Sequence, residues 1–253
     1  YDVSDLDKIQ LAGSAEIPEC CADRILVNSG LAYLSVSETK NLSPNVYIVD
    51  VSDPSWPSLT GSVAMPDKVY DLYQSGNYLF VANGAKGLQV VRLQGTQAPA
   101  VIGSLNVKGE PKAVDAGNGY ACLAAQDNGL LVVDVKNPAQ PVLKGELSTP
   151  GSAVDLSLDG NYAYVADQGS GLQVVDISSP AFPKIVGSAG TPDNMPYRVF
   201  AGGGYAYVAN NDHGLIIYDV NSPAEPAQIG ALKTSSAAQD VQVADNLAYV
   251  ATS

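Results

Sequence analysis

The sequence has very little of several residue types on which chemistry usually depends. It contains one His, three Cys, two Met and one Trp in 253 residues. A single His excludes metal sites built from several His side chains and leaves His213 as the one candidate for His-based catalysis. Three Cys are too few for the disulfide framework that holds many small secreted domains together. An apolar content of 46% is enough for a sizeable core instead.

Positive charge is scarce as well. The chain has 13 Lys and Arg against 26 Asp and Glu, a formal net charge of −13. Nucleic acid and anionic membrane surfaces are therefore excluded as partners, because both need clustered positive charge. No apolar run approaches the roughly 18 residues that a membrane span requires, so we expect no membrane insertion by this segment. Apolar residues also do not recur with the helical period over a useful length.

Internal repetition, in contrast, is abundant. The glycine of a Val/Ile-Gly-Ser phrase or of a variant of it recurs about every 42 residues, at Gly13, Gly61, Gly103, Gly145, Gly187 and Gly230. A Tyr-Ala-Tyr-Val phrase or a variant of it recurs with the same period, starting at Leu31, Tyr78, Tyr120, Tyr162, Tyr205 and Leu247. One such unit cannot bury its own apolar face and must stack on its neighbours. We therefore expect one domain over residues 1–253.

Four short β-strands are expected in each unit. In the fourth unit they cover residues 153–158, 162–166, 172–177 and 184–189. Asp159-Gly160-Asn161 is a hairpin signal between the first two strands. Pro180 and Pro183 precede the fourth strand, which we therefore place at the edge of the sheet. Four antiparallel strands in each repeat of this length are typical of a β-propeller blade.

The phrase Gly-Leu-x-Val-Val-Asp-Val/Ile with a following Pro, as at residues 129–138 and 171–180, resembles the LVIVD repeat. The resemblance covers essentially the whole chain. It implies a propeller from a bacterial or archaeal protein that is exported or attached to the cell surface, and hence an extracellular, cell-surface or periplasmic location. It implies almost nothing about activity. We expect an all-β, six-bladed propeller of four-stranded antiparallel blades.

One departure from this phrase indicates what its Asp does. In four units a Pro follows the Asp by four residues: Asp50, Asp134, Asp176 and Asp219 precede Pro54, Pro138, Pro180 and Pro223. The second unit has Arg92 in place of the Asp, and there the Pro is missing too. We interpret the Asp as structural, because a carboxylate can accept hydrogen bonds from the backbone N–H groups of the bend that follows it. A ligand-binding role is the alternative.

The two ends of the chain complement each other. The C-terminal part supplies a first strand over residues 238–243 and a second over 247–251, and then stops. The N-terminus opens with the end of the missing phrase, Tyr1-Asp2-Val3, and continues into a fourth strand over 9–14. We expect a closing blade shared between the termini, with residues 1–3 beside Tyr249. Because the chain begins inside a unit and without Met, we also expect it to be a trimmed part of a longer protein.

The first strand of each blade should line a central channel. Its polar position is occupied by Arg24, Asp71, Asp155, Arg198 and Asp240, and in the third unit by Ala113 or, after a small shift, Asp115. In a six-bladed ring Arg24 would face Asp155, and Asp71 would face Arg198. Such a ring either selects a small charged ligand or cation, or it is a charge-compensated structure tied to water and the neighbouring backbone. We favour the structural interpretation.

The loops between second and third strands should meet the crossovers between blades on one face of the ring. Their Asn and Asp residues are Asn83, Asp127, Asn128, Asp167, Asn210, Asn211 and Asp212, joined by Glu19, Asp67 and Asp193 of the crossovers. Such oxygen ligands suit Ca²⁺. Tight turns, however, demand the same residues, and no loop has the carboxylate spacing of a calcium motif. We therefore expect no metal and no cofactor, with Ca²⁺ as the alternative.

Four other side chains stand out. Cys20 and Cys21 are adjacent in a crossover on that face, and they form a vicinal disulfide, bond to a partner or remain thiols. Cys122 takes the place of Tyr164 and Tyr207 in other units and is expected to be a small buried filler. Trp56 lies in an outer bend, where it either contacts a partner or covers its own blade.

Three functions are compatible with these observations. The first is a non-catalytic module that presents the loop face, including His213, to a protein or a surface polymer. The second is a hydrolase or lyase with a metal at the channel mouth, which would need converging carboxylates and a base. The third is a structural subunit of a larger extracellular assembly. We favour the first, because no nucleophile motif such as Gly-x-Ser-x-Gly accompanies the single His, and fold alone does not decide.

Overall fold

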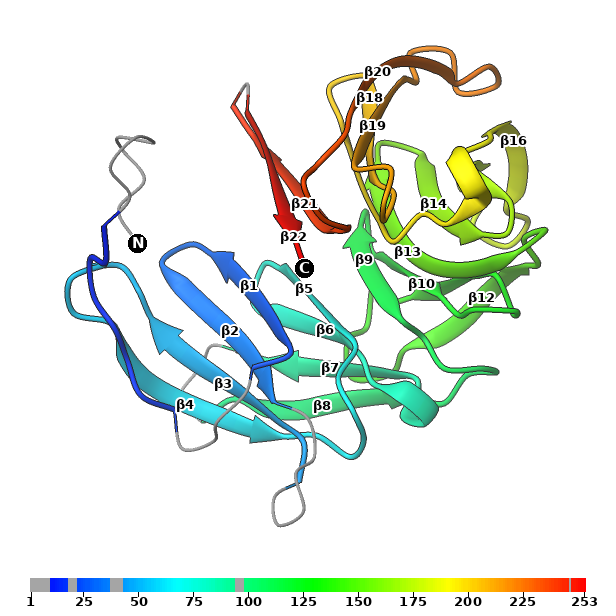
Figure 1. Ribbon diagram of the computed structural model, residues 1–253. Coiled ribbons are helices and arrows are strands. Elements are labelled where there is room, and N and C mark those ends of the chain that lie inside the picture. Colours follow the sequence, from blue (N-terminus) through cyan, green and yellow to red (C-terminus); the bar gives the residue numbers. More distant parts are fainter. Residues whose placement is uncertain (1–9, 18–21, 37–42, 94–97, 246) are drawn as a thin grey trace.

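The computed structural model describes residues 10–17, 22–36, 43–93, 98–245 and 247–253. In these ranges the chain forms six antiparallel sheets, five with four strands and one with two. The sheets follow one another around a central axis like the blades of a propeller (Figure 1). The predicted six-bladed, all-β architecture is thereby confirmed.

The first three blades span the N-terminal half of the chain. Blade 1 contains β1 (Arg24–Asn28), β2 (Leu31–Val36), β3 (Asn45–Asp50) and β4 (Ser58–Ala64). Blade 2 contains β5 (Asp71–Ser75), β6 (Tyr78–Ala82), β7 (Leu88–Arg92) and β8 (Ala100–Leu105), with a 3₁₀ turn η1 (Gly84–Lys86) between β6 and β7. Blade 3 contains β9 (Ala113–Gly117), β10 (Tyr120–Ala124), β11 (Leu130–Asp134) and β12 (Val142–Leu147).

The remaining blades complete the arc. Blade 4 contains β13 (Ser152–Asp159), β14 (Tyr162–Gln168), β15 (Gly171–Asp176) and β16 (Lys184–Ala189). A second 3₁₀ turn, η2 (Pro192–Asn194), leads to blade 5, which contains β17 (Arg198–Gly202), β18 (Tyr205–Ala209), β19 (Leu215–Asp219) and β20 (Ala227–Leu232). Blade 6 contains β21 (Ala238–Ala244) and β22 (Leu247–Thr252). The strands predicted for the fourth unit agree with β13–β16 to within about two residues at each end.

Equivalent residues of the repeat occupy equivalent places in the sheets. Within a blade each strand pairs with the next along the chain, and the first strand is innermost (Figure 1). In the five four-stranded blades the pairing of third and fourth strands shifts register at one place, such as between Val174 and Val175. One residue before the repeat glycine is bulged out of the ladder there, which increases the twist of the outer edge.

The apolar core is divided among the seams between blades. Five clusters of buried side chains are found in the described part of the chain, one at each seam from blades 1 and 2 to blades 5 and 6. At the first seam, for example, Tyr33, Val46 and Ile48 of blade 1 pack with Leu72 and Val81 of blade 2. Fully burying one such side chain stabilises the fold by about 1.5–3 kcal/mol. Each blade thus depends on its neighbours for its stability.

A glycine contact joins the outer edges of adjacent blades. A Cβ atom on Gly103 would lie 2.1 Å from the carbonyl oxygen of Pro138, which is in the bend of the next blade. The same contact recurs at Gly145, Gly187 and Gly13, where the distances to the proline oxygens of the following bends would be 2.2, 2.1 and 2.3 Å. A glycine is therefore required at these four positions, because the neighbouring backbone approaches too closely for any side chain.

Gly13 shows where the N-terminal part of the described chain lies relative to blade 1. Its contact with Pro54 of blade 1 is the same contact that the fourth strands of blades 2, 3 and 4 make with the blade that follows each of them. Residues 10–17 therefore lie where the fourth strand of the blade before blade 1 belongs. The strand expected at residues 1–3 lies outside the described residues, so its pairing with Tyr249 stays a prediction.

The Asp that ends the third strand of blades 1, 3, 4 and 5 makes the predicted hydrogen bond. Asp50, Asp134, Asp176 and Asp219 each accept a hydrogen bond from the backbone N–H two residues later, at 2.8–3.0 Å. Hydrogen bonds from Ser178 lower the pKa of Asp176. The carboxylate therefore orders the bend, and that bend in turn packs against the glycine of the preceding blade.

We predict that Asp176→Ala lowers the free energy of unfolding by about 1 kcal/mol at neutral pH, since the lost bond involves a charged acceptor but is only half-buried. Because the pKa of Asp176 is lower in the folded protein, its contribution is present above the unfolded value near about 4 and is lost as the pH falls through the folded value. Urea unfolding at pH 7 and pH 3 measures both effects. Asp176→Asn, which retains one acceptor oxygen, should lose less, and an unchanged stability in Asp176→Ala would contradict the structural role.

Candidate functional site

A central cavity runs between the six innermost strands. It has a volume of about 400 Å³ and is lined by residues of β1, β5, β9, β13, β17 and β21. All five charged residues predicted for the ring line it: Arg24, Asp71, Asp155, Arg198 and Asp240. In blade 3 the equivalent residue is Ala113, which pairs with Ala124 as Asp71 pairs with Ala82. Asp115 lies two residues further along the strand, on the same face.

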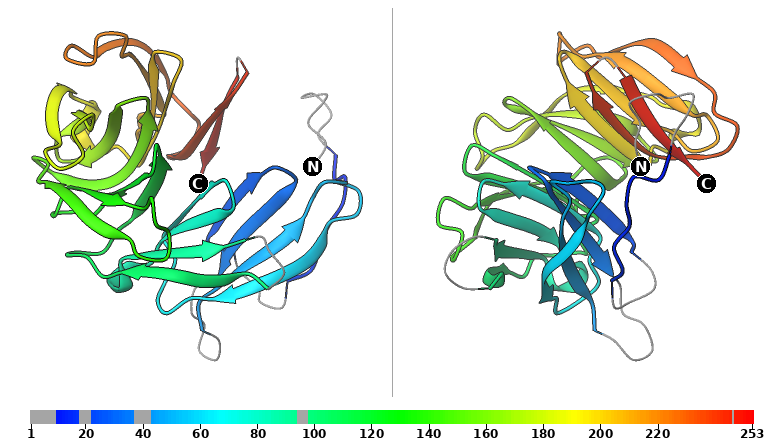
Figure 2. Two further views of the ribbon diagram at one scale, coloured as in Figure 1. Left: turned by 180° about the vertical axis from the view of Figure 1, so that it is seen from behind. Right: turned by 90° about the vertical axis from the view of Figure 1, so that its left-hand side faces the viewer.

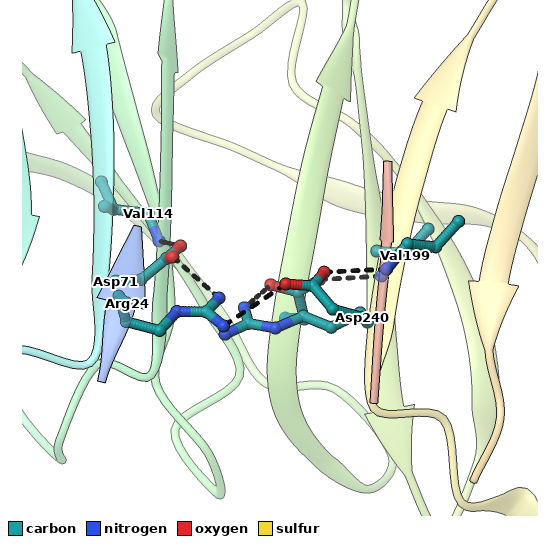
Figure 3. A network of polar contacts seen from close by, with 8 residues as sticks. Arg24, Asp71, Val114, Val199 and Asp240 are labelled. Carbon is teal, nitrogen blue, oxygen red and sulfur yellow. Dashed lines mark hydrogen bonds and ion pairs between the residues drawn. The ribbon is translucent and has the colours of Figure 1, made fainter. Parts of the chain in front are cut away.

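The ion pairs of the ring connect neighbouring blades. Nη2 of Arg24 lies 3.1 Å from Oδ1 of Asp71, and its Nη1 lies 3.5 Å from Oδ2 of Asp240. Figure 3 shows the Arg24 side chain reaching between these two carboxylates. Arg198 pairs with Asp155 at 2.5 Å. We expected Arg24 to face Asp155 and Asp71 to face Arg198 across the channel. The three ion pairs given above join adjacent blades instead.

The carboxylates of the ring also bind backbone of the next blade. Oδ2 of Asp71 accepts a hydrogen bond from the N–H of Val114 at 3.1 Å (Figure 3), and Oδ2 of Asp155 accepts one from Val199 at 2.8 Å. Oδ2 of Asp115 accepts the equivalent bond from Leu158 at 2.8 Å. Because each of these bonds crosses a seam, the ring holds consecutive first strands together, as the structural interpretation requires.

Burial sets the protonation of these acids. Desolvation raises the pKa of Asp71 to about 6 despite the nearby Arg24, and raises that of Asp115 to about 6 despite hydrogen bonds from Leu158, Ala116 and Tyr73. Desolvation and the charge of Asp71 raise the pKa of Asp155 well above its ordinary value. The sequence named Asp115 only as an alternative ring residue of the third unit. The signal for it was a single Asp within the apolar phrase Ala113-Val-Asp-Ala116.

Four of the predicted polar residues of the loop face form hydrogen bonds within the fold. Asp167 is fully buried and accepts hydrogen bonds from the Thr149 hydroxyl at 2.7 Å and the Gly151 N–H at 2.8 Å. Asp67 accepts backbone hydrogen bonds from Lys68 at 2.7 Å and Ala85 at 2.9 Å. The amides of Asn83 and Asn210 donate to carbonyl oxygens of the crossovers beside them. These residues fasten the loops to the crossovers.

A smaller group remains accessible over blade 5. Nε2 of His213 lies 2.6 Å from Oδ2 of Asp193, and both side chains are exposed. Asp212 beside them is exposed, and Asn211 and Asp193 have φ values of 49° and 55° in the left-handed region. Met195 and Tyr197 follow on the crossover with exposed side chains. The sequence had indicated the acidic residues and His213 but not these two apolar neighbours.

The other predicted residues are dispersed. Asp127 is exposed and Asn128 half-buried in the β10–β11 loop of blade 3. Cys122 is buried, as expected of a filler, and burial raises the pKa of its thiol. Trp56 has 81% of its surface exposed, which argues against a covering role on its own blade. Glu19, Cys20 and Cys21 lie outside the described residues.

Neither a metal group nor a membrane helix is found in the described ranges. Within them no three His, Cys, Asp or Glu side chains come together in an arrangement that would hold a metal ion. Across the same ranges, none of the helices has the length and apolar character needed to cross a membrane.

We predict that the midpoint of thermal unfolding falls as the pH rises from 5 to 7. The folded pKa of Asp115, about 6, lies above its unfolded value. Its favourable contribution is therefore present below the unfolded pKa and lost as the pH rises through the folded one. The loss amounts to at most about 3 kcal/mol. Asp115→Asn should flatten this dependence relative to Asp127→Asn, an exposed control, and equal pH profiles in both variants would refute the assignment.

We predict no tight Ca²⁺ site, since Asp67 and Asp167 are occupied by hydrogen bonds of the fold. Thermal unfolding of the chelator-treated protein with and without micromolar Ca²⁺ should give the same midpoint. A rise in the midpoint that Asp127→Ala or Asp167→Ala removes would show a bound ion, because a ligand of the folded state stabilises it by mass action.

Comparisons with known proteins agree with the fold. Among solved structures, the computationally designed Ika8 protein is similar with a TM-score of 0.70 and 12% identity, over 90% of this chain and 67% of the designed one. A functionally unknown protein from Desulfotomaculum acetoxidans DSM 771 has a TM-score of 0.69 and 12% identity, over 83% of this chain and 69% of its own. Apo AztD from Citrobacter koseri has a TM-score of 0.54 and 15% identity, over 85% and 60%.

Such identities support the fold and nothing about activity. A search of the curated proteins by sequence finds no match. The repeat itself is more specific. The LVIVD repeat matches six segments, at residues 24–65, 68–92, 108–149, 150–191, 197–234 and 236–253. Each segment lies within one of the six blades, and the chain therefore belongs to the LVIVD repeat family.

Proposed function

We propose that this propeller is a non-catalytic binding module that engages a partner protein through the loop face of blades 4 and 5. The observation that carries the proposal is the accessible group on the crossover into β17 and the β18–β19 loop. There Met195 and Tyr197 expose apolar surface beside the His213–Asp193 pair. Exposed aromatic and Met side chains next to charged groups are typical of the centre and rim of protein interfaces.

The chemistry of the rest of the loop face supports this choice. The buried carboxylates of the channel and the loops spend their hydrogen-bonding capacity on the backbone of the next blade or crossover. The acids that remain accessible here are Asp193, Asp212 and, one blade away, Asp127. A partner for this surface should therefore present an apolar contact flanked by Lys or Arg, which also suits the net charge of −13.

The propeller hydrolase remains the competing proposal, because His213 and Asp193 form a hydrogen-bonded pair at 2.6 Å. An Asp–His pair acts in nucleophilic catalysis only when a nucleophile stands within hydrogen-bond reach of the imidazole. Both members of this pair lie on an open rim rather than in the cavity, so neither is sheltered from water. These features favour an interface role for His213.

The proposed location is extracellular, at the cell surface or in the periplasm. It rests on the resemblance of the repeat phrase alone. Fractionation of cells that produce the native protein, followed by detection of the chain in each fraction, is the corresponding measurement.

We predict that a photo-crosslinker at Tyr197 captures a protein partner in the native cells, whereas one at Phe182, which is more exposed and lies on the opposite face, does not. Met195→Asp should reduce the Tyr197 product about tenfold, since it buries a charge at the contact. Capture at both positions or at neither would refute the proposed face. A surface polymer as partner would appear as binding to cell-wall material that Met195→Asp abolishes, and it would replace the protein partner in the proposal.

Assays of the purified protein decide between binding and catalysis. A screen of lactone, phosphoester and glycoside substrates should give no turnover. A rate that is lost in His213→Ala and retained in Asp127→Ala would show that the His213–Asp193 pair is catalytic and would overturn the binding-module proposal.

A further inference from the structure

A second cavity lies at the seam between blades 3 and 4, on the face opposite to the loop face. Its volume is about 230 Å³. The two blades stand side by side (Figure 2), and the turns between their first and second strands form part of the mouth of the cavity. The apolar residues of the wall are Val132, Leu158 and Ile177, and the polar residues of the mouth are Asn118, Asn161 and Ser178. Since an apolar cavity of about 150 Å³ holds benzene, this one has room for a single ring with a short substituent.

A departure from the repeat accounts for this space. The third residue of the second strand is Tyr or Phe in five units, as at Phe80 and Tyr164, but it is Cys122 in blade 3. The aromatic side chains of Phe80 and Tyr164 are buried within their seams. Cys122 pairs with Asp115 on one side and Val132 on the other, and both of these residues line the cavity. Because Cys is much smaller than an aromatic ring, it leaves space beside these two neighbours.

Asp115 gives the cavity its charge. Its counterparts in the other units are uncharged, namely Leu26, Tyr73, Ser157, Phe200 and Gln242. Asp71 and Asp155 of the channel are paired with Arg24 and Arg198. Within the described ranges, in contrast, no Lys, Arg or His side chain forms an ion pair with Asp115, although only 8% of its surface is exposed. Buried charges in proteins are normally paired, so a positive partner for this carboxylate is missing from the described structure.

Two tyrosines line the cavity with this carboxylate. The hydroxyl of Tyr73 donates a hydrogen bond to Asp115, and Tyr120 stands at the start of β10. An ammonium group is attracted to the face of an aromatic ring, more strongly where water is excluded. The exposed Lys136 already makes such a contact, with its Nζ 4.7 Å from the centroid of the Tyr120 ring. The surroundings of the cavity therefore suit a cation with an apolar body.

We propose that this cavity binds a small organic cation, consisting of a protonated amine attached to a single apolar or aromatic ring. The ammonium group lies against Asp115 and supplies the counter-charge that the arginines supply to the other buried acids of the channel. The ring occupies the space beside Cys122 and contacts the apolar wall. The amides of Asn118 and Asn161 are available at the mouth for a polar substituent. This site is separate from the proposed protein-binding face, which lies on the other side of the ring.

The charge of Asp115 should control binding. Its pKa is about 6, so most of the protein carries the carboxylate at pH 7.5 and only about one tenth carries it at pH 5. The titratable groups that act on it are Tyr73 and Asp71 of β5 and Cys122 of β10, while Leu158 of β13 contributes a backbone N–H. The pKa of Tyr73 is raised to about 12 and burial raises that of Cys122, so neither changes charge between these pH values.

Asp71 does titrate in the same range, because its pKa is also about 6. The variant Asp115→Asn separates the two acids, since it removes one charge and leaves the ion pair of Asp71 with Arg24 in place. A primary amine stays protonated from pH 5 to pH 7.5. We therefore expect its affinity for the parent protein to fall about tenfold over that range, in proportion to the ionised fraction of Asp115.

Benzylamine and benzyl alcohol are matched probes, because they share a ring and differ in charge. In titration calorimetry with the intact protein at pH 7.5, benzylamine should bind saturably and at least about tenfold more tightly than benzyl alcohol. Equal binding of the two would show apolar contact alone, and a lack of saturable benzylamine binding would show no site; either result refutes the proposal. Tighter binding of methyl glucoside than of benzylamine would identify a site for neutral sugars and would refute it as well.

Three variants locate the contact. Asp115→Asn should reduce benzylamine binding to the level of benzyl alcohol and remove its dependence on pH. Cys122→Phe restores the ring found in other units and should abolish binding of both probes, with the thermal midpoint as the check on folding. Asp127→Asn, an exposed acid of the loop face, is the control that should change neither affinity. Benzylamine binding that survives Asp115→Asn, or that Asp127→Asn weakens equally, would overturn the assignment. The comparison of probes and the pH profile of the parent decide the question even where a variant fails to fold.

Discussion

The structure depends on one constraint, which is that each blade has two apolar faces and can bury neither alone. In blade 4 the alternation of a β-strand sends Tyr164 and Val174 to the seam with blade 5, and Val165 and Val175 to the seam with blade 3. Adjacent residues of the Val-Val phrase therefore serve different interfaces. Because both faces must be covered, a blade is stable only between two others, and the ring follows from this requirement.

Polar residues of the first strands connect neighbouring blades at the channel. A seam that is apolar in the sheets still leaves backbone N–H groups at the channel, and the carboxylates of Asp71, Asp115 and Asp155 satisfy them across the seam. Burial makes these charges costly, and for this reason their pKa values are raised. The arginines compensate part of that cost from neighbouring blades. The charged residues of the channel therefore have a structural role, which is to hold consecutive blades together, and this role requires no ligand.

The sequence was sufficient to predict the structural features that recur in every unit of the repeat. The strand order, the edge position of the fourth strand and the bend Asp all follow from phrases that recur, so comparison of the copies separated structural residues from variable ones. Single departures were harder to interpret. The position of Asp115, two residues from the ring position, depends on its pairing with Cys122, and the exposure of Met195 and Tyr197 depends on how one crossover folds. Neither property is repeated, so no second copy revealed it.

The same reasoning indicates where function should be sought in a chain of this kind. Residues that obey the repeat are committed to seams, bends and loop anchors, and their replacement would first destabilise the fold. Surface that is free to acquire a partner lies where the repeat is broken. One such place is the left-handed backbone at Asp193, beside His213. This departure adds polar groups to the loop face without changing the strands beneath it. A partner at this place would therefore meet side chains on an already folded scaffold.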